Sequence, residues 1–341
     1  MNKAKILVTG GTGYIGSHTV VELQQKGFDV VIVDNFSNSY HEVVDSIEKI
    51  TNIHPEFQEF DLCDFEKTYS FFKENKIDAI IHFAAFKAVG ESVEKPLKYY
   101  HNNLFSLINL LKCANEFGVN NFVFSSSCTV YGQSDELPVT EKAPIKQALS
   151  PYGNTKQISE EIISDTVETT SLKSILLRYF NPIGAHESSL IGELPIGIPN
   201  NLVPFITQTA IGKHEFLRVF GNDYNTPDGT CIRDYIHVVD LAKAHVIAVE
   251  RLLNNKNKSA YEIFNLGTGN GNSVLEVIKT FEKVSGVKLN YKLVERRAGD
   301  IEKVWASTEY ANKELGWKAE KDLNEMLKSA WDWEISLNKK V

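Results

Sequence analysis

The chain has 341 residues and a mass of 38.4 kDa, which is too long for one ordinary core and predicts one large α/β domain or two lobes. Hydrophobic residues make up 43% and charged residues 23%, which excludes a disordered or fibrous chain. The net charge of −8, from 44 acidic and 36 basic residues, excludes a broad basic surface for nucleic acid. Four cysteines are widely spaced without a Cys-x-x-Cys pair, so we expect no metal site, no disulfide framework and a reducing compartment.

Signals for membranes or secretion are also missing from the sequence. The apolar runs are far shorter than the roughly 18 residues that a membrane span needs. The N-terminal residues lead into only a short apolar run, Ile6-Leu7-Val8, which is too little for a signal-peptide core. We therefore expect a cytoplasmic protein that binds no membrane.

Short β-like runs alternate with helical stretches in the first half of the chain. Strands are expected over 5–9, 29–33, 56–60, 79–83 and 121–124, and helices over 14–26, 40–51, 64–75 and 96–117. Such alternation predicts βαβ units and a doubly wound parallel sheet of the Rossmann type. Residues 182–204 form an irregular connection, followed by helices near 202–211, 239–253 and 322–333 and strands near 216–220 and 261–265.

A glycine-rich turn follows the first expected strand. Gly10, Gly13 and Gly16 stand between that strand and a helix, as a dinucleotide-binding turn requires. Glycine lets the backbone approach a pyrophosphate, and the helix N-terminus faces that anion. A plain strand-to-helix turn is the alternative for the glycines alone. Asp34, however, ends the second strand roughly 20 residues beyond the loop, where a carboxylate bonds the adenosine ribose.

A carboxylate at Asp34 would repel a 2′-phosphate, so the pattern predicts NAD rather than NADP. Asp61 and Leu62 follow the third strand and are predicted to meet the adenine. The alternative for Asp61 is that it caps the next helix.

A serine, a tyrosine and a lysine follow in an order that suits proton transfer. Ser127 comes just after the strand 121–124, at the strand end where ligands of parallel sheets bind. Ser150 and Pro151 predict a helix start, and Tyr152 and Lys156 then share one helix face. A nearby ammonium and a nicotinamide cation favour the phenolate, so Tyr152 could act as a base, with Ser127 steadying the sugar oxygen. An ordinary surface pair is the alternative for a lone Tyr-x-x-x-Lys.

These motifs resemble the extended short-chain dehydrogenase/reductases, and among them the UDP-glucose 4-epimerase family. The resemblance covers essentially the whole chain. The matching strings are 8–18, 81–85, 87–92, 124–132, 150–153, 177–182, 197–202, 233–237 and 261–267.

The resemblance implies an isomerase that interconverts UDP-galactose and UDP-glucose with a tightly held NAD. Hydride leaves C4 of the sugar, and the 4-keto intermediate turns and receives the hydride on its other face. Tyr152 is then the base and acid, Lys156 anchors the ribose and lowers the Tyr152 pKa, and Ser127 bonds the sugar hydroxyl. Further NAD contacts are implied at Tyr14, Ile15, Asp34, Asn35, Asp61, Leu62, Phe83, Ala84, Ala85, Lys87, Asn102, Ser125, Tyr179 and Phe180.

Sugar-nucleotide contacts are implied mainly in the second half. They fall at Lys87, Ser127, Tyr152, Asn181, Asn201, Arg233, Arg297, Asp300 and Val304. The two arginines suit a diphosphate, although Arg296 stands beside Arg297 and leaves the register open. These motifs place an NAD-binding domain at 1–181 and a smaller mixed α/β domain for the UDP-sugar at 182–341. The segment near 233–267 is expected to return to the first domain.

Two positions depart from the family pattern. Cys128 stands where alanine is usual, and Val304 stands where some members have a tyrosine against the hexose. The smaller Val304 leaves room for an N-acetyl group, so we expect UDP-GalNAc and UDP-GlcNAc as further substrates. We also expect a homodimer that pairs the helices 96–117 and 152–167. The alternative for the apolar stripe of Ile158, Ile162 and Val167 is packing on the sheet.

Two rival functions remain open at this point. A 4,6-dehydratase or decarboxylase would share the glycine loop and the Tyr–Lys pair, but these enzymes usually carry an acid after the strand-end serine. Cys128 and Thr129 occupy those places here. A non-catalytic NAD-sensing regulator could use the same fold, but it would not need Ser127, Tyr152 and Lys156 together.

Overall fold

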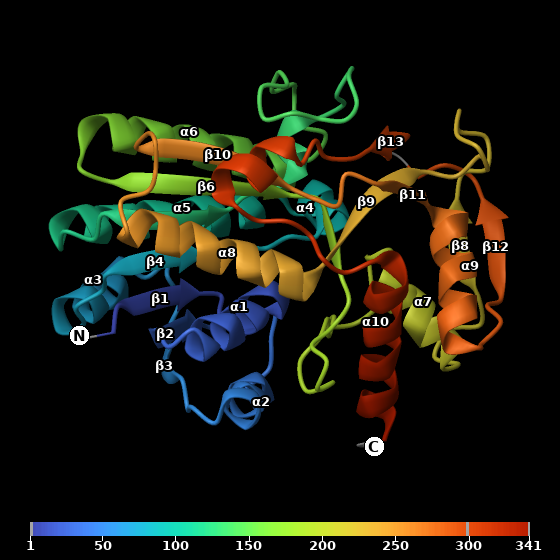
Figure 1. Ribbon diagram of the computed structural model, residues 1–341, viewed down its shortest axis with the longest axis horizontal. Helices are drawn as coiled ribbons and strands as arrows, with labels where there is room; N and C mark the ends of the chain where they lie inside the picture. The colour runs from blue at the N-terminus through green and yellow to red at the C-terminus, as the bar shows by residue number, and fades with distance from the viewer. Residues whose placement is uncertain (1–2, 298–299, 340–341) are drawn as a thin grey trace.

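A seven-stranded parallel sheet organises the structure, a computed structural model that describes residues 3–297 and 300–339 (Figure 1). In spatial order the strands are β3 (Glu56–Glu59), β2 (Asp29–Asp34), β1 (Lys5–Thr9), β4 (Ala79–His82), β5 (Asn121–Ser125), β6 (Lys173–Tyr179) and β10 (Tyr261–Leu266). The chain therefore starts in the middle of the sheet, moves out to β3 and returns to build the other half. This order brings the ends of β1 and β4 together in one crevice, where open α/β sheets bind ligands.

Helices cover both faces of this sheet. Side chains alternate along β1, so Ile6 and Val8 face one side and Leu7 the other. Ile6 and Val8 join an apolar cluster with α1 (Tyr14–Gln25), α2 (Glu42–Thr51) and α8 (Val238–Leu253). Leu7 joins a second cluster with α3 (Phe65–Glu74), α5 (Pro96–Glu116) and α6 (Pro151–Thr169). Burial on both faces explains the nearly continuous apolar strands and confirms the predicted doubly wound fold.

A smaller mixed α/β lobe stands beside the large sheet in Figure 1. Its strand β9 (Ile232–His237) pairs with β7 (Asn181–Ile183), β11 (Gly271–Ser273) and β13 (Lys303–Val304), while β8 (Leu217–Phe220) pairs with β12 (Tyr291–Val294). The helices α7 (Leu202–Ala210), α9 (Val274–Ser285) and α10 (Leu323–Asn338) share one apolar cluster with β7, β8 and β9. Between β9 and β11 the chain crosses back, so that α8 packs on α1 and β10 pairs with β6.

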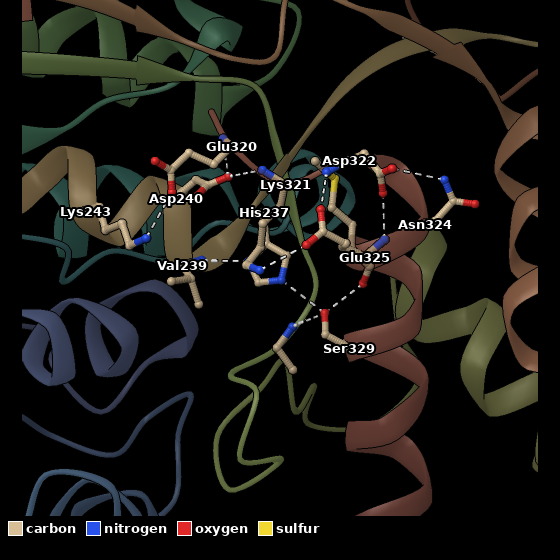
Figure 2. Close-up of polar contacts among 12 residues, drawn as sticks. His237, Val239, Asp240, Lys243, Glu320, Lys321, Asp322, Asn324, Glu325 and Ser329 are labelled. Atoms are coloured by element: carbon tan, nitrogen blue, oxygen red, sulfur yellow. Dashed lines mark hydrogen bonds and ion pairs between the residues drawn. The ribbon is translucent and has the colours of Figure 1, made fainter. Parts of the chain in front are cut away.

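Polar contacts fasten α10 to the start of α8, as Figure 2 shows. Asp240 in the first turn of α8 accepts hydrogen bonds from the backbone N–H groups of Glu320 and Lys321, each at 2.9 Å. His237 Nε2 lies 3.1 Å from the Ser329 hydroxyl on α10. The ring of His237 is therefore used within the fold. Within 3–297 and 300–339, no helix is long and apolar enough to cross a membrane.

Candidate active site

The glycine turn lies at the carboxyl end of β1 and lines an open cleft. Gly10 has φ of +69°, and a Cβ there would lie 2.7 Å from the backbone nitrogen of Ala84. A Cβ on Gly16 would lie 2.2 Å from the carbonyl oxygen of Gly10. Both positions therefore require glycine. The first turn of α1 lines the same cleft with N–H groups that have no partner inside the helix, which makes the turn a fitting cradle for a pyrophosphate.

Asp34 ends β2, and its carboxylate lies against the glycine turn. One carboxylate oxygen accepts from the Thr12 N–H at 3.2 Å, and the other accepts from the Phe36 N–H at 3.0 Å. A carboxylate has roughly four acceptor positions, so it can still bond ribose hydroxyls. The negative charge of Asp34 and its position at the end of β2 suit the adenosine ribose of NAD.

Asp61 lines the same cleft. Its carboxylate accepts from the Cys63 N–H at 2.8 Å. The helix α3 is instead capped by Asp64, whose carboxylate accepts from the Lys67 N–H at 3.1 Å. The alternative role of Asp61 as a helix cap is therefore wrong.

Most of the residues expected to contact NAD line this one cleft. They are Gly10, Gly13, Tyr14, Ile15, Gly16, Asp34, Asn35, Asp61, Leu62, Phe83, Ala84, Ala85, Lys87, Asn102, Tyr152, Lys156 and Tyr179. Ser125 and Phe180 do not line it. The Ser125 hydroxyl donates to the Tyr179 hydroxyl at 3.0 Å, and Phe180 is buried in the apolar cluster that contains Val304. Sequence reasoning missed Phe60 and Phe86, which also line the cleft beside predicted residues.

The helix α6 carries Tyr152 and Lys156 into the cleft. Ser150 caps this helix by accepting from the Gly153 N–H at 3.1 Å, as its sequence predicts. Both functional side chains are buried, and Lys156 Nζ donates to the carbonyl oxygen of Ser125 at 2.7 Å. Burial lowers the pKa of Lys156 to about 8, although the nearby Glu160 carboxylate acts to raise it. The ammonium thus loses its proton more easily than an exposed lysine does.

The phenol of Tyr152 is held in its protonated form by the chain itself. Burial raises its pKa well above the usual range, and Tyr179 adds to the effect. The Ser127 hydroxyl acts in the opposite direction because it favours the phenolate. The expected lowering by Lys156 and the nicotinamide concerns the enzyme with NAD bound and stays a prediction.

A buried ion pair that sequence reasoning missed supports this constellation. Arg178 on β6 donates through Nε and Nη2 to both carboxylate oxygens of Glu160, at 3.0 and 2.5 Å. Ser126 donates to the same carboxylate at 2.5 Å. Ser126 directly precedes Ser127, and Glu160 lies one helical turn beyond Lys156. The pair therefore fixes the strand end and the helix that carry the expected catalytic groups.

A second cleft lies in the smaller lobe, and several of the expected sugar-nucleotide residues line it. They are Asn181, Asn201, Arg233, Arg297 and Asp300. The cleft also contains apolar side chains of β8, such as Phe220, which no sequence signal marked. The guanidinium of Arg297 donates to the Asp300 carboxylate at 2.7 Å. Two arginines beside an apolar wall suit a diphosphate joined to a base.

Val304 and Ser127 stand near the boundary between the two lobes. Val304 on β13 pairs with Arg233 on β9 and is buried in a cluster with Phe180 and Cys128. Ser127 is buried just after β5, and its hydroxyl oxygen accepts a hydrogen bond from the Thr129 N–H at 3.2 Å. Neither residue lines the first or the second cleft.

The comparisons with known proteins agree with this arrangement. A family model described as GDP-mannose 4,6 dehydratase matches residues 7–330. UDP-glucose 4-epimerase from Bacillus subtilis (strain 168) is 53% identical over 97% of both chains. A structure of UDP-glucose 4-epimerase from Bifidobacterium longum in complex with NAD+ and UDP is 46% identical, covers 99% of this chain and 100% of its own, and superposes with a TM-score of 0.95. The structure of the UDP-Glc/GlcNAc 4-epimerase from Campylobacter jejuni is 38% identical, covers 98% of this chain and 99% of its own, and has a TM-score of 0.84.

Fold, glycine turn and Tyr–Lys pair define a nucleotide-sugar enzyme of the extended short-chain dehydrogenase/reductase class, within the range of the matched family model. The chain belongs to the UDP-glucose 4-epimerase family. The resemblance stated from the motifs is confirmed, and so is the enzyme class of isomerase. The rival dehydratase is not favoured, although the family model has a dehydratase name, because the acid that dehydration needs is replaced by Cys128 and Thr129.

Proposed function

We propose that this enzyme interconverts UDP-galactose and UDP-glucose by inversion at C4, with Tyr152 as base and acid, Lys156 as ribose anchor and Ser127 as partner of the reacting hydroxyl. The observation that carries the proposal is the convergence of Tyr152, Lys156 and the glycine turn in one cleft. NAD bound there would supply the acceptor and later the donor of the C4 hydride. The remaining proposed NAD contacts are those of the first cleft together with Ser125 and Phe180.

The side chains of the first cleft suit proton transfer beside a redox centre. The Ser127 hydroxyl favours the phenolate of Tyr152, so it can help the phenol to take the proton of a sugar hydroxyl. Lys156 presents an ammonium that would donate a hydrogen bond to the ribose of NAD and would favour negative charge on Tyr152. Because burial raises the pKa of Tyr152, the base becomes effective only when cationic groups stand close to it.

We assign binding of the sugar nucleotide to the second cleft. Arg233 and Arg297 would hold the diphosphate, and Asn181, Asn201 and Asp300 would bond the uridine and sugar hydroxyls. Lys87, Tyr152 and Val304 would face the hexose. Under this assignment residues 1–181 bind NAD and 182–341 bind the UDP-sugar, with the segment 233–267 contributing to the first domain. The pairing of β10 with β6 supports that last part.

Substitution of Tyr152 by phenylalanine tests the proposed role directly. The purified enzyme is incubated with UDP-galactose without added NAD, and the C4 epimers are resolved. We expect Tyr152→Phe to lose turnover by a factor of about 100 or more, because the proton acceptor is removed. Bound NAD should remain, since the glycine cradle is untouched. Unchanged turnover in this variant would remove Tyr152 from its role.

The proposed substrate range extends to UDP-GalNAc and UDP-GlcNAc. The small side chain of Val304 supports this extension, and the similar Campylobacter jejuni enzyme is described as a UDP-Glc/GlcNAc 4-epimerase. An N-acetyl group is bulkier than a hydroxyl, so the space beside the hexose decides whether it is accepted.

The proposed assembly is a homodimer that pairs α5 and α6 of two chains. Leu97 and Phe105 on α5 are 81% and 52% exposed, which is unusual for such large apolar side chains. Ile158 on α6 is half-buried and can extend this surface. Val167 and Ile162, by contrast, pack in the cluster beneath the sheet, as the alternative reading of the stripe states.

A further inference from the structure

A carboxylate stands where the cofactor cleft meets the sugar-nucleotide cleft. Glu193 belongs to the irregular segment between β7 and α7, and its side chain is only 11% exposed. Its Oε1 accepts from Asn201 Nδ2 at 2.6 Å and from Lys87 Nζ at 3.3 Å. Its backbone carbonyl accepts from the Trp333 indole on α10 at 3.0 Å. One oxygen atom thus joins residues that lie on different lobes.

The two partners of Glu193 belong to different clefts. Lys87 lines the first cleft and Asn201 lines the second. A third cleft is lined by both partners, Lys87 and Asn201, and also by Glu193 and Tyr14. Tyr14 also lines the first cleft, and its ring lies 5.6 Å from Lys87 Nζ. Burial raises the pKa of Tyr14, and the charge of Glu193 raises it further, which places the carboxylate within electrostatic reach of the glycine turn.

We infer that Glu193 is a positioning residue that couples the two clefts, so that UDP bound in one strengthens the hold on NAD in the other. The inference rests on the proposed assignment of the clefts. A ligand that orders Asn201 or Lys87 also orders the carboxylate that they share. The second ligand then meets partners whose conformational freedom is already reduced, which is positive coupling.

Charge explains why the coupling passes through this residue and not directly between the ligands. NAD and UDP are both anions, so their direct interaction is repulsive. Glu193 would also repel each of them, but its contacts with residues of the two clefts are to the Lys87 ammonium and the Asn201 amide. Lys87 offsets the charge of the carboxylate, and the pair can therefore stand between two anions without opposing either strongly.

The test measures the dissociation constant of UDP for protein loaded with NAD and for protein from which NAD has been removed. The ratio of the two constants is the coupling factor. We expect a factor of about 5 or more in the unaltered chain and a factor near 1 in Glu193→Ala. Glu193→Gln keeps an acceptor for Asn201 but loses the ion pair with Lys87, so its factor should lie between these values.

Glu187→Ala is the matched control. Glu187 lies in the same segment, is exposed and makes no hydrogen bond or ion pair with any residue in 3–297 or 300–339. This variant should keep the full coupling factor. The rate of NAD release with and without saturating UDP gives a second measurement that needs no stripped protein.

The possible outcomes separate the inference from the proposed function. If the unaltered chain binds neither NAD nor UDP, the proposed function fails. If it binds both, a factor near 1 in the unaltered chain, or an unchanged factor in Glu193→Ala, overturns the role of Glu193 and leaves the proposed function standing.

Discussion

At the scale of single residues, Val304 makes the substrate range testable. It is buried with Phe180 and Cys128 next to Arg233, so a larger side chain has no free surface into which to turn. We expect Val304→Tyr to lower kcat/KM for UDP-GalNAc by about tenfold or more while UDP-galactose is still turned over. Val304→Ala, the control, should accept both substrates. An equal loss on both substrates in the tyrosine variant would point to damaged packing and contradict a selective role.

Residues whose partners lie close in sequence were predictable, and residues whose partners lie far away were not. Tyr152 and Lys156 could be paired because a helix brings positions four apart onto one face. Glu193 stands in a segment without periodicity, 106 residues from Lys87 in sequence, so only the fold shows their contact. Arg178 lay inside a recognised string, yet nothing in that string indicated its partner Glu160.

At the scale of elements, the Glu160–Arg178 pair joins α6 to β6 and holds the end of β5. Its side chains are 8% and 5% exposed, and their contact is bidentate. We expect Arg178→Met to lower the free energy of unfolding by about 3–5 kcal/mol, because it leaves a buried carboxylate without its cation. Denaturant unfolding followed by circular dichroism measures this loss.

Two further variants show whether the loss comes from the unpaired charge. Glu160→Gln combined with Arg178→Met removes both charges and should recover part of the stability. Lys321→Met breaks the exposed pair with Glu325 and should cost about 0–1 kcal/mol. Equal losses in Arg178→Met and Lys321→Met would show that burial of the pair does not matter.

Among the elements, most of those named from the sequence lie within a few residues of their predicted bounds, but α10 runs on to Asn338, and the strands β6 and β9 were not predicted. The short strands β7, β11 and β13 span two or three residues each, which is too little for any period, and they form only because β9 pairs with them. The helix α9 was missed although its signals were present. Ser273 and Glu276 form a capping box, and Gly286 ends the helix in the left-handed conformation with φ of +72°.

At the scale of the whole molecule, the proposed dimer depends on the exposed apolar side of α5. Leu97→Glu and Phe105→Glu place charges where two chains would meet, so each should shift the light-scattering mass from twice 38.4 kDa towards 38.4 kDa. Ile53→Glu is the control, because Ile53 is also exposed, at 44%, but belongs to the connection between α2 and β3 and not to α5 or α6. A mass near 38.4 kDa for the unaltered chain would rule out the dimer.

The folded protein should lose stability as the pH falls, because it buries histidines in their neutral form. Burial lowers the pKa to about 3 for His18, His82 and His237 and to about 4 for His245. In the unfolded chain a histidine has its ordinary pKa of about 6.5. Between the folded and the unfolded pKa values, the unfolded chain therefore binds more protons than the folded protein. Stability contributed by each neutral ring is complete above pH 6.5 and is lost as the pH falls.

The slope of stability against pH measures this effect. Each ring should contribute up to about 1.4 kcal/mol per pH unit below pH 6.5, until its own folded pKa is reached. His18→Gln should reduce the slope by about one such contribution, because glutamine does not titrate. Its loss of stability near pH 7 should be modest, since only Nδ1 of His18 has a hydrogen-bond partner among the residues described here, the Tyr14 carbonyl at 2.7 Å. Denaturant unfolding at about pH 7, 6 and 5 provides both slopes, and equal slopes for the two proteins would show that His18 is not buried as the neutral ring.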